Sequence, residues 1–323
     1  MLIIIVYNRN LDKVISKLGR QNKELYDEDT IDEVEKIFLK NGYEVRSVDG
    51  NLDMFENLRE INRKQGGLPF VFNMAYGIQG ESRYSHIPSI LEMLGLPYLG
   101  SGPEGHTLAL DKIVSKIMMG YLDIPTPSFR QIDLPGQKDK DIGFPLILKP
   151  AMEASSFGVK LAHDQDELNE LVSAAMDEFN QPVFIEEFIR GKEYALGLLG
   201  NGKNTECLPL VEIELDQNEE GVFDSGKKQF RPGIRQADIP HEMLLEIEQK
   251  AKKIFHFLRL RDYARVDIRI DEQGKFWFLE VNSMAGLRTT GLIMGAAEIA
   301  GYSYEKLIIK LFETARRRYS DFI

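Results

Sequence analysis

Strand and helix patterns alternate through the first hundred residues, and this alternation constrains the fold more than any other feature of the sequence. Apolar runs predict strands, and apolar positions with helical spacing predict helices. The predicted elements are, in order, a strand at 2–6, a helix at 30–42, a strand at 43–48, a helix at 53–64, a strand at 69–73 and a helix at 86–94. Such a series builds a parallel sheet, so we expect an α/β domain over residues 1–103.

The loop after the strand at 69–73 is a candidate binding loop. Ligands of parallel sheets bind beyond the carboxyl ends of the strands, and this loop carries Asn73, Gly77 and Gly80, followed by Glu81. We therefore count Glu81 among the candidate substrate residues. The alternative is a plain glycine-rich connection.

The composition indicates an ordinary globular protein. Of its 323 residues, 43% are hydrophobic and 28% are charged, and this length accommodates two or three domains. Cys207 is the single cysteine, which excludes a disulfide framework and fits a reducing cytoplasm. The net charge of −11 argues against a nucleic-acid surface. No apolar run reaches the roughly 18 residues that span a bilayer, and the apolar N-terminus is typical of a buried strand. We expect a cytoplasmic protein that acts on small molecules, without nucleic-acid or membrane partners.

The rest of the chain mixes strands and helices without strict alternation, which is typical of α+β units. One helix is expected between the glycine-rich turn at 100–102 and a proline-bounded linker. The other predicted elements are strands at 144–150, 182–189 and 206–213, helices at 164–179, 241–258 and 303–317, and a hairpin at 265–283. We expect two α+β units, over residues 104–190 and 191–323.

The stretch "RVDIRIDEQGKFWFLEVNS" (265–283) predicts the hairpin, with "DEQG" as its turn. In the simplest register, Arg265 lies opposite Glu280 and Asp267 lies opposite Phe278. Side chains alternate along a strand, so the two faces differ in kind. One face collects the core residues Val266, Ile268, Trp277, Leu279 and Val281. The other collects Arg265, Asp267, Glu280 and Asn282, together with Phe276 and Phe278.

The second face has the chemistry of a hard-cation site. Asp267 and Glu280 offer carboxylates, and Asn282 offers an amide oxygen. Mg²⁺ prefers oxygen ligands and usually completes its octahedron with substrate phosphates and waters. The alternative is a solvated hairpin face in which Arg265 simply pairs with Glu280.

Several lysines could hold a phosphate. Lys112 lies on a helix, Lys149 ends the apolar strand "FPLIL", and Lys227 and Lys228 lie in a polar segment. A lysine at the end of a buried strand needs a partner for its charge, either a phosphate or a nearby carboxylate. The loop "EASSFG" (153–158) could form an anion-binding nest of backbone N–H groups, with hydroxyls from Ser155 and Ser156; a surface loop is the alternative.

Acidic residues end the strand in "FIEEFIRGKE" (184–193). Of Glu186 and Glu187, one can face solvent while the other accepts a hydrogen bond from an exocyclic amine such as that of adenine. Glu193 could accept from ribose hydroxyls. The alternative is a charged strand edge. The five histidines show no metal-ligand spacing, so we interpret each as structural or exposed.

Six segments, in this order, resemble the ATP-grasp enzymes and among them the D-alanine–D-alanine ligase group. The resemblance runs from about residue 69 to 317, and its segments are "GLPYLGSG" (95–102), "ALDK" (109–112), "LILKP…EASSFGV" (146–159), "FIEEFIRGKE" (184–193), "ARVDIRID" (264–271) and "FLEVNSMAG" (278–286). It implies a Rossmann-like N-terminal parallel-sheet domain followed by two ATP-grasp α+β subdomains. It also implies an ATP-dependent carboxylate–amine ligase that works through an acyl phosphate.

The resemblance also implies roles for individual residues. The nucleotide would be held by Lys112 and Lys149 at the phosphates, by the loop residues Glu153, Ser155 and Ser156, by the adenine hinge Glu186, Glu187, Phe188 and Ile189, by Glu193 at the ribose, and by Lys227 on a mobile loop. Asp267, Glu280 and Asn282 would bind two Mg²⁺ ions, with Mn²⁺ as the alternative metal. Arg265 would stabilise the tetrahedral oxyanion, with Ser155 and Gly286 as further catalytic positions.

Departures from the family pattern concern the substrate pockets. The stretch 6–13 lacks the glutamate that dipeptide ligases use for the first substrate's amine. In the tail motif, Ala285 replaces a proline, Arg288 replaces a threonine, and Gly291 replaces the serine that binds the second substrate. Lys228 stands in place of the lid tyrosine. We therefore expect a ligase for another amino-acid-like pair, with Arg288, Glu81 and Lys228 as candidate substrate residues.

Two other interpretations stay open from the sequence. The first is a true D-alanine–D-alanine ligase, and the second is a non-catalytic nucleotide-binding protein. The set of Arg265, Asp267, Glu280 and Asn282 argues against the second, because binding alone does not need an oxyanion-stabilising group. By analogy with the resembled group, the expected assembly is a homodimer.

Overall fold

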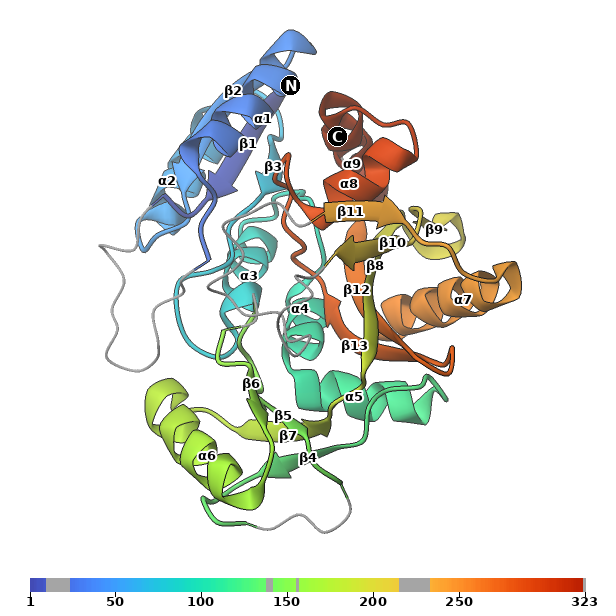
Figure 1. The fold of residues 1–323 in the computed structure, drawn as a ribbon. Coiled ribbons are helices and arrows are strands. Elements are labelled where there is room, and N and C mark those ends of the chain that lie inside the picture. Colours follow the sequence, from blue (N-terminus) through green and yellow to red (C-terminus); the bar gives the residue numbers. More distant parts are fainter. Residues whose placement is uncertain (10–23, 138–141, 155–156, 215–232, 322–323) are drawn as a thin grey trace.

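The computed structural model describes residues 1–9, 24–137, 142–154, 157–214 and 233–321. It contains one parallel and two antiparallel sheets with helices packed against them (Figure 1), which confirms the predicted mixture of α/β and α+β architecture. Among the described helices, none combines the length and hydropathy that crossing a lipid bilayer requires.

The N-terminal sheet is parallel, as predicted. Its strands are β1 (Leu2–Tyr7), β2 (Glu44–Asp49) and β3 (Phe70–Asn73), in the order β2-β1-β3, and its helices are α1 (Glu28–Lys40), α2 (Met54–Lys64) and α3 (His86–Met93), with the short 3₁₀ helix η1 (Arg83–Ser85) before α3. Every side chain of β1 is buried. Alternate residues of β1 enter two different apolar clusters, one on each face of the sheet. Burial on both faces explains why this strand is a continuous apolar run.

The central sheet is antiparallel and consists of β4 (Phe129–Ile132), β5 (Leu146–Pro150), β6 (Lys160–Ala162) and β7 (Val183–Glu187), in the order β4-β7-β5-β6. Helix α6 (Gln165–Phe179) covers one face, where Leu168 and Val172 pack in one cluster with Leu148 and Ile185. Lys149 and Glu186 alternate with these apolar residues and therefore face away from α6.

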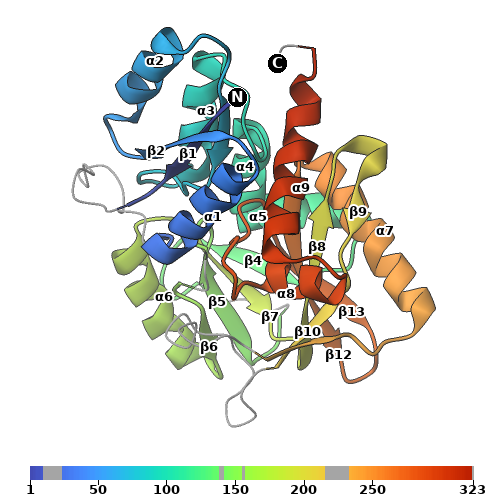
Figure 2. The ribbon, with the colours of Figure 1, turned by 90° about the horizontal axis from the view of Figure 1, so that it is seen from above.

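The C-terminal sheet is larger. Its path is β11-β10-β8-β12-β13, built from β8 (Gly191–Leu199), β10 (Val211–Glu214), β11 (Gly233–Gln236), β12 (Tyr263–Asp271) and β13 (Phe276–Asn282), and β9 (Glu206–Cys207) pairs with β8. The helices around it are α7 (His241–Phe257), α8 (Leu292–Ile299) and α9 (Tyr304–Arg316), with the 3₁₀ helices η2 (Gly202–Asn204) and η4 (Arg317–Tyr319). Helix α9 also lies beside α1 (Figure 2), where the rings of Phe312 and Phe38 are 5.5 Å apart.

Two helices, rather than the single predicted one, connect the N-terminal and central sheets. Helix α4 (Pro103–Leu110) ends at Asp111, whose Oδ1 accepts from the N–H groups of Ile113 and Val114 and so caps α5 (Lys112–Tyr121). Both helices contact β13. We propose that the chain divides near residues 103 and 190, with α5 packed across the junction between the two later units.

Candidate active site

The hairpin of β12 and β13 has a different register from the predicted one. Arg265 lies opposite Asn282, and Asp267 lies opposite Glu280. A β-bulge after Asp267 then shifts the pairing, so that Ile268 lies opposite Phe278. The expectation of Arg265 opposite Glu280 and Asp267 opposite Phe278 was therefore wrong.

The bulge also reassigns the aromatic residues of β13. Phe276 and Phe278 lie in the apolar cluster with Val266 and Ile268, not on the polar face as we expected. An extra residue on one strand moves every side chain beyond it to the opposite face of the sheet from the one expected. The polar set nevertheless stays together, because Arg265, Asp267, Glu280 and Asn282 all lie on the same side of the bulge.

Arg265 and Asp267 form a bidentate ion pair. Arg265 Nε and Nη2 donate to the two carboxylate oxygens of Asp267 at 2.6 and 2.7 Å. Burial opposes the charge of Arg265, but the Asp267 carboxylate outweighs it and raises the pKa of the guanidinium, which therefore stays cationic. Burial raises the pKa of Asp267, and the ion pair with Arg265 opposes this effect only in part.

Glu280 lies between positive charges. Its Oε2 is 3.6 Å from Lys112 Nζ, and its Oε1 accepts from Asn282 Nδ2 at 3.2 Å. Burial alone would raise the pKa of Glu280, but Lys112, Lys149 and Arg265 outweigh burial and lower this pKa. The carboxylate is therefore ionised and available as a ligand.

The donors on this face fit a hard divalent cation. Asp267 and Glu280 face each other across the strand pair, and Asn282 reaches both, donating to Asp267 Oδ2 at 2.9 Å. With its amide reversed, Asn282 would present an oxygen to the same place. No group of three or more His, Cys, Asp or Glu side chains suited to a metal occurs within the described ranges. A cation held by two carboxylates and an amide would need phosphate or water oxygens to complete its coordination.

Lys149 points to a carboxylate of the neighbouring strand. Its Nζ pairs with Glu186 Oε1, and the second oxygen of Glu186 lies 2.8 Å from Lys116 Nζ. Burial favours the protonated form of Glu186, but the two lysines outweigh burial and lower its pKa to about 2. We did not single out Lys116 from the sequence, although it follows Lys112 by one helical turn and so shares its face.

The predicted hinge connects β7 to β8 and is held by a residue that the sequence reasoning missed. Arg269 Nη1 donates to the Ile189 carbonyl at 3.0 Å, and Nη2 donates to Glu193 Oε2 at 2.7 Å. Its guanidinium also lies 5.5 Å from the centre of the Phe188 ring. Arg269 and Glu193 are direct cross-strand neighbours in β12 and β8, a pairing that the sequence alone did not reveal.

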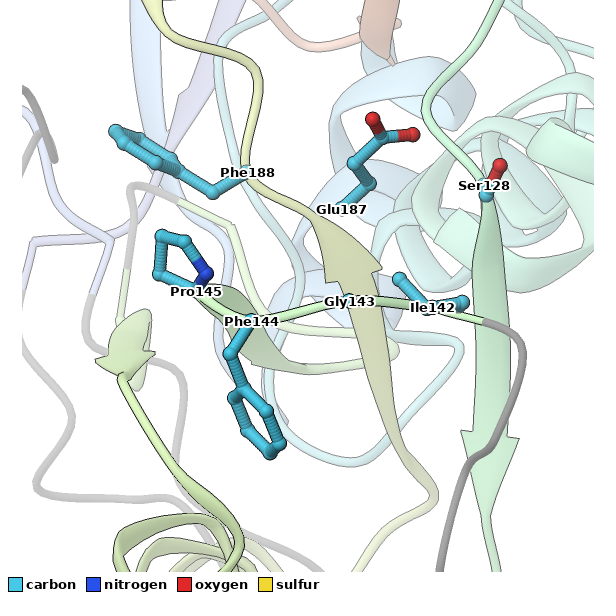
Figure 3. A pocket seen from close by; sticks show the side chains of 7 residues that line it. All are labelled: Ser128, Ile142, Gly143, Phe144, Pro145, Glu187 and Phe188. Carbon is cyan, nitrogen blue, oxygen red and sulfur yellow. The ribbon is translucent and has the colours of Figure 1, made fainter.

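Glu187 faces away from Glu186, as strand alternation requires. It lines a pocket of about 310 Å³ beside the hinge, with Ser128, Ile142, Gly143, Phe144, Pro145 and Phe188 (Figure 3). We expected one of the two glutamates to face solvent and the other to accept a hydrogen bond from an exocyclic amine; in the structure Glu186 lies between two lysines and Glu187 lines this pocket.

The start of the predicted phosphate loop contacts other residues of the central unit and Arg83 of the N-terminal unit. The carbonyl of Glu153 accepts from Lys112 Nζ. The Glu153 carboxylate accepts from Gln181 at 2.9 Å and lies 3.5 Å from Arg83 Nη2. Of the other expected nucleotide and substrate residues, Ser155, Ser156, Lys227 and Lys228 lie outside the described residues.

A buried glutamate near this loop also escaped the sequence reasoning. Glu24 Oε2 accepts from Arg83 Nη2 at 3.2 Å, and both carboxylate oxygens lie 2.8 Å from the Tyr84 hydroxyl. The same Arg83 donates to the Met152 carbonyl at 2.8 Å. The stretch 6–13 contains no glutamate, as noted from the sequence, but Glu24 follows it and brings a carboxylate to the site. Glu81, on the same loop as Arg83, is exposed.

The tail residues lie beside a set of tyrosines. The Arg288 guanidinium stacks 4.9 Å from the centre of the Tyr26 ring and donates to the Leu25 carbonyl. A Cβ built on Gly286 would lie 3.6 Å from both Arg288 Nη1 and the Tyr76 hydroxyl. Arg288 is thus next to Gly286, but part of its hydrogen-bonding capacity is used by the segment before α1.

Comparisons with known proteins agree with this architecture. Residues 120–313 match the family model described as the D-ala D-ala ligase C-terminus. An uncharacterized protein, y4sG of Sinorhizobium fredii, is 35% identical over 99% of this chain and 98% of its own length. The D-alanine–D-alanine ligase of Bordetella avium is 34% identical over 77% of this chain and 78% of its own length.

A solved structure of a similar protein superposes on this chain over almost its full length. The D-alanine–D-alanine ligase of Bacillus anthracis, crystallised with ATP, superposes with a TM-score of 0.78 and 25% sequence identity. The superposition covers 99% of both chains.

Proposed function

Because this chain belongs to the D-alanine–D-alanine ligase family of ATP-grasp ligases, we propose that it joins a carboxylate to an amine in an amino-acid-like pair other than two D-alanines. ATP would be converted to ADP and phosphate. The observation that carries this proposal is the polar face of Arg265, Asp267, Glu280 and Asn282. Lys112 lies 3.6 Å from Glu280, and both Lys112 and Lys149 lower the pKa of this carboxylate.

The nucleotide would lie between the central and C-terminal sheets. Its adenine would contact the hinge from Glu186 to Ile189, its ribose would contact Glu193, and its phosphates would contact Lys112 and Lys149. Arg269 supports this assignment, because it fixes a hinge carbonyl and the Glu193 carboxylate with one buried guanidinium. Glu153 and the serines after it would cover the phosphates.

Asp267, Glu280 and Asn282 would hold divalent cations, which we propose to be two Mg²⁺ ions or Mn²⁺ in their place. When bound, such ions would neutralise negative charge on the phosphates. The positive neighbours of Glu280 hold its pKa below the ordinary value of a glutamate. Its carboxylate is therefore already ionised when a cation binds.

The reaction would proceed in two steps. A substrate carboxylate attacks the γ-phosphate, which gives an acyl phosphate and ADP, while Lys112 and Lys149 bind the phosphate oxygens. An amine then attacks the acyl carbon, and phosphate leaves. Arg265 would stabilise the tetrahedral oxyanion; its Nη1 makes no hydrogen bond within the described part of the chain. The backbone N–H of Gly286 and the hydroxyl of Ser155 are our further candidates for this stage.

The substrate pair is proposed from Arg288. A guanidinium beside Gly286 suits a substrate carboxylate, and the family's usual tail has a threonine at this position and a serine where this chain has Gly291. Glu81 and Lys228 remain further candidate substrate residues.

One observation favours the second candidate, a true D-alanine–D-alanine ligase. Glu24 places a buried carboxylate near the phosphate loop, and the dipeptide ligases use a glutamate from this part of the chain for the first substrate's amine. Here, however, Arg83 and Tyr84 already engage both oxygens of Glu24.

The decisive experiment is an ADP-release screen with paired D- and L-amino acids and dipeptides, with mass detection of the product. We expect turnover with a pair that contains at least one substrate other than D-alanine. Full turnover with D-alanine alone would establish the second candidate and overturn our reading of the pockets.

A further inference from the structure

Among the described lysines and arginines of the proposed nucleotide site, Lys116 has the most buried side chain. Its side chain is 0% exposed, compared with 13% for Lys149, and its Nζ is 2.8 Å from Glu186 Oε2. The ammonium also donates to Thr126 Oγ1 at 2.8 Å. Thr126 in turn donates to the Phe278 carbonyl at 2.8 Å, which ties this group to β13. Lys116 is therefore held in place from two directions.

Lys149 pairs with the other oxygen of the same carboxylate. One negative charge thus faces two positive charges, and the positive excess lies beside the proposed phosphate position. Burial opposes the charge of Lys149, but the carboxylates of Glu186 and Glu280 outweigh it and raise its pKa. Lys149 therefore remains an ammonium that can bind another anion.

A lone lysine could not leave Glu186 without cost, because a buried carboxylate that loses its only partner is strongly destabilised. With Lys116 in place, Glu186 keeps one counter-ion when Lys149 turns away. We propose that Lys116 is a positioning residue, the permanent counter-ion of Glu186 that allows Lys149 to exchange this carboxylate for the phosphates of the nucleotide. The proposal rests on the assignment of the nucleotide site made above.

The test compares two ligands that differ in their need for Lys149. Adenosine carries no phosphate, whereas ATP requires the exchange. The dissociation constants of both are measured by titration calorimetry for the wild type and for K116M, K116R and the double variant K116M/E186Q. The matched control is K250M, which removes a lysine that bonds the Asp123 carbonyl and pairs with Glu246 outside this network.

We expect K116M to lose at least about tenfold in affinity for ATP relative to adenosine, because Lys149 becomes the one counter-ion of Glu186 in the part of the chain that the structure describes. K116R should keep the ratio of ATP affinity to adenosine affinity close to the wild-type value. The double variant should restore it, because a neutral glutamine does not hold Lys149. K250M should keep the wild-type ratio.

An unchanged ratio of ATP affinity to adenosine affinity in K116M would overturn the proposal, whether both affinities stay at the wild-type value or fall together. A lowered ratio in K116M that the double variant does not restore would also overturn it. If K116M does not fold, E186Q alone still decides, because it frees Lys149 and must not lower the ratio. A wild type that binds ATP but forms no amide would contradict the proposed reaction while leaving this test intact. A wild type that does not bind ATP would refute both.

Discussion

Asp267 lies directly opposite Glu280 in the antiparallel pair of β12 and β13. Two carboxylates at a direct cross-strand position repel each other unless cations lie between or beside them. Arg265 neutralises the first and Lys112 approaches the second. The pair is thus built with acidic oxygens facing one another and cations at its margin, which is the arrangement that a divalent ion would complete.

Replacing Glu280 with glutamine removes one of the two proposed anionic ligands. We expect the rate of ADP release to fall by at least about 100-fold. This loss is larger than the loss typical for residues that only hydrogen-bond to a metal ligand. Adenosine affinity should stay near the wild-type value, because the base contacts the hinge. A variant that keeps full turnover would contradict the role assigned to this face.

Metal removal tests the same face without mutation. After treatment with EDTA, we expect ADP release to stop and to return on titration with Mg²⁺ or Mn²⁺, because hard oxygen donors bind both ions. Adenosine binding, followed by calorimetry, should survive the chelator. Turnover that continues in EDTA would show that the carboxylate pair has another purpose.

Stability should depend on pH through Glu186. Its pKa is lowered to about 2 in the folded protein, whereas an unfolded glutamate titrates near about 4.3. The unfolded chain thus binds the proton more readily, and stability falls as pH falls between these values. The ionised pair contributes on the order of 3 kcal/mol above this range. Urea unfolding from pH 6 to pH 3 should show a smaller pH slope for E186Q; equal slopes would contradict the prediction.

Arg269 should govern nucleotide affinity rather than the chemical step. In R269M, the Ile189 carbonyl and the Glu193 carboxylate lose a shared donor. We expect the KM for ATP to rise by about tenfold or more, since a hydrogen bond to a charged group contributes about 1.5–3 kcal/mol. The kcat should change little. The control is R259M, which breaks an exposed pair with Glu104 and should leave both constants unchanged.

Arg288 should determine how well the carboxylate substrate binds. We expect R288A to raise the KM for that substrate by about 10- to 100-fold, because a charge-assisted hydrogen bond is lost, while the KM for ATP stays constant. Substrate saturation curves at fixed ATP measure this. If both KM values rose together, Arg288 would instead be a structural link to Tyr26 and Leu25.

The sequence by itself determined the parallel N-terminal sheet and the gathering of the polar hairpin residues on one face. The reason in both cases is local periodicity. A strand that is apolar at every position must be buried on both faces, as β1 is. Alternation also places Arg265 and Asp267 together, and it separates Glu186 from Glu187.

Only the tertiary structure decided which residues lie opposite one another. The bulge in the hairpin is accompanied by hydrogen bonds to residues outside it: the Phe278 N–H donates to the Pro125 carbonyl, and the Phe278 carbonyl accepts from Thr126. Likewise, Lys149 and Lys116 both pair with Glu186, and Arg83 pairs with Glu24, across long separations in the chain. Periodicity fixes the face on which a side chain lies, but a charge partner is fixed by the packing of whole elements, which no short stretch of sequence contains.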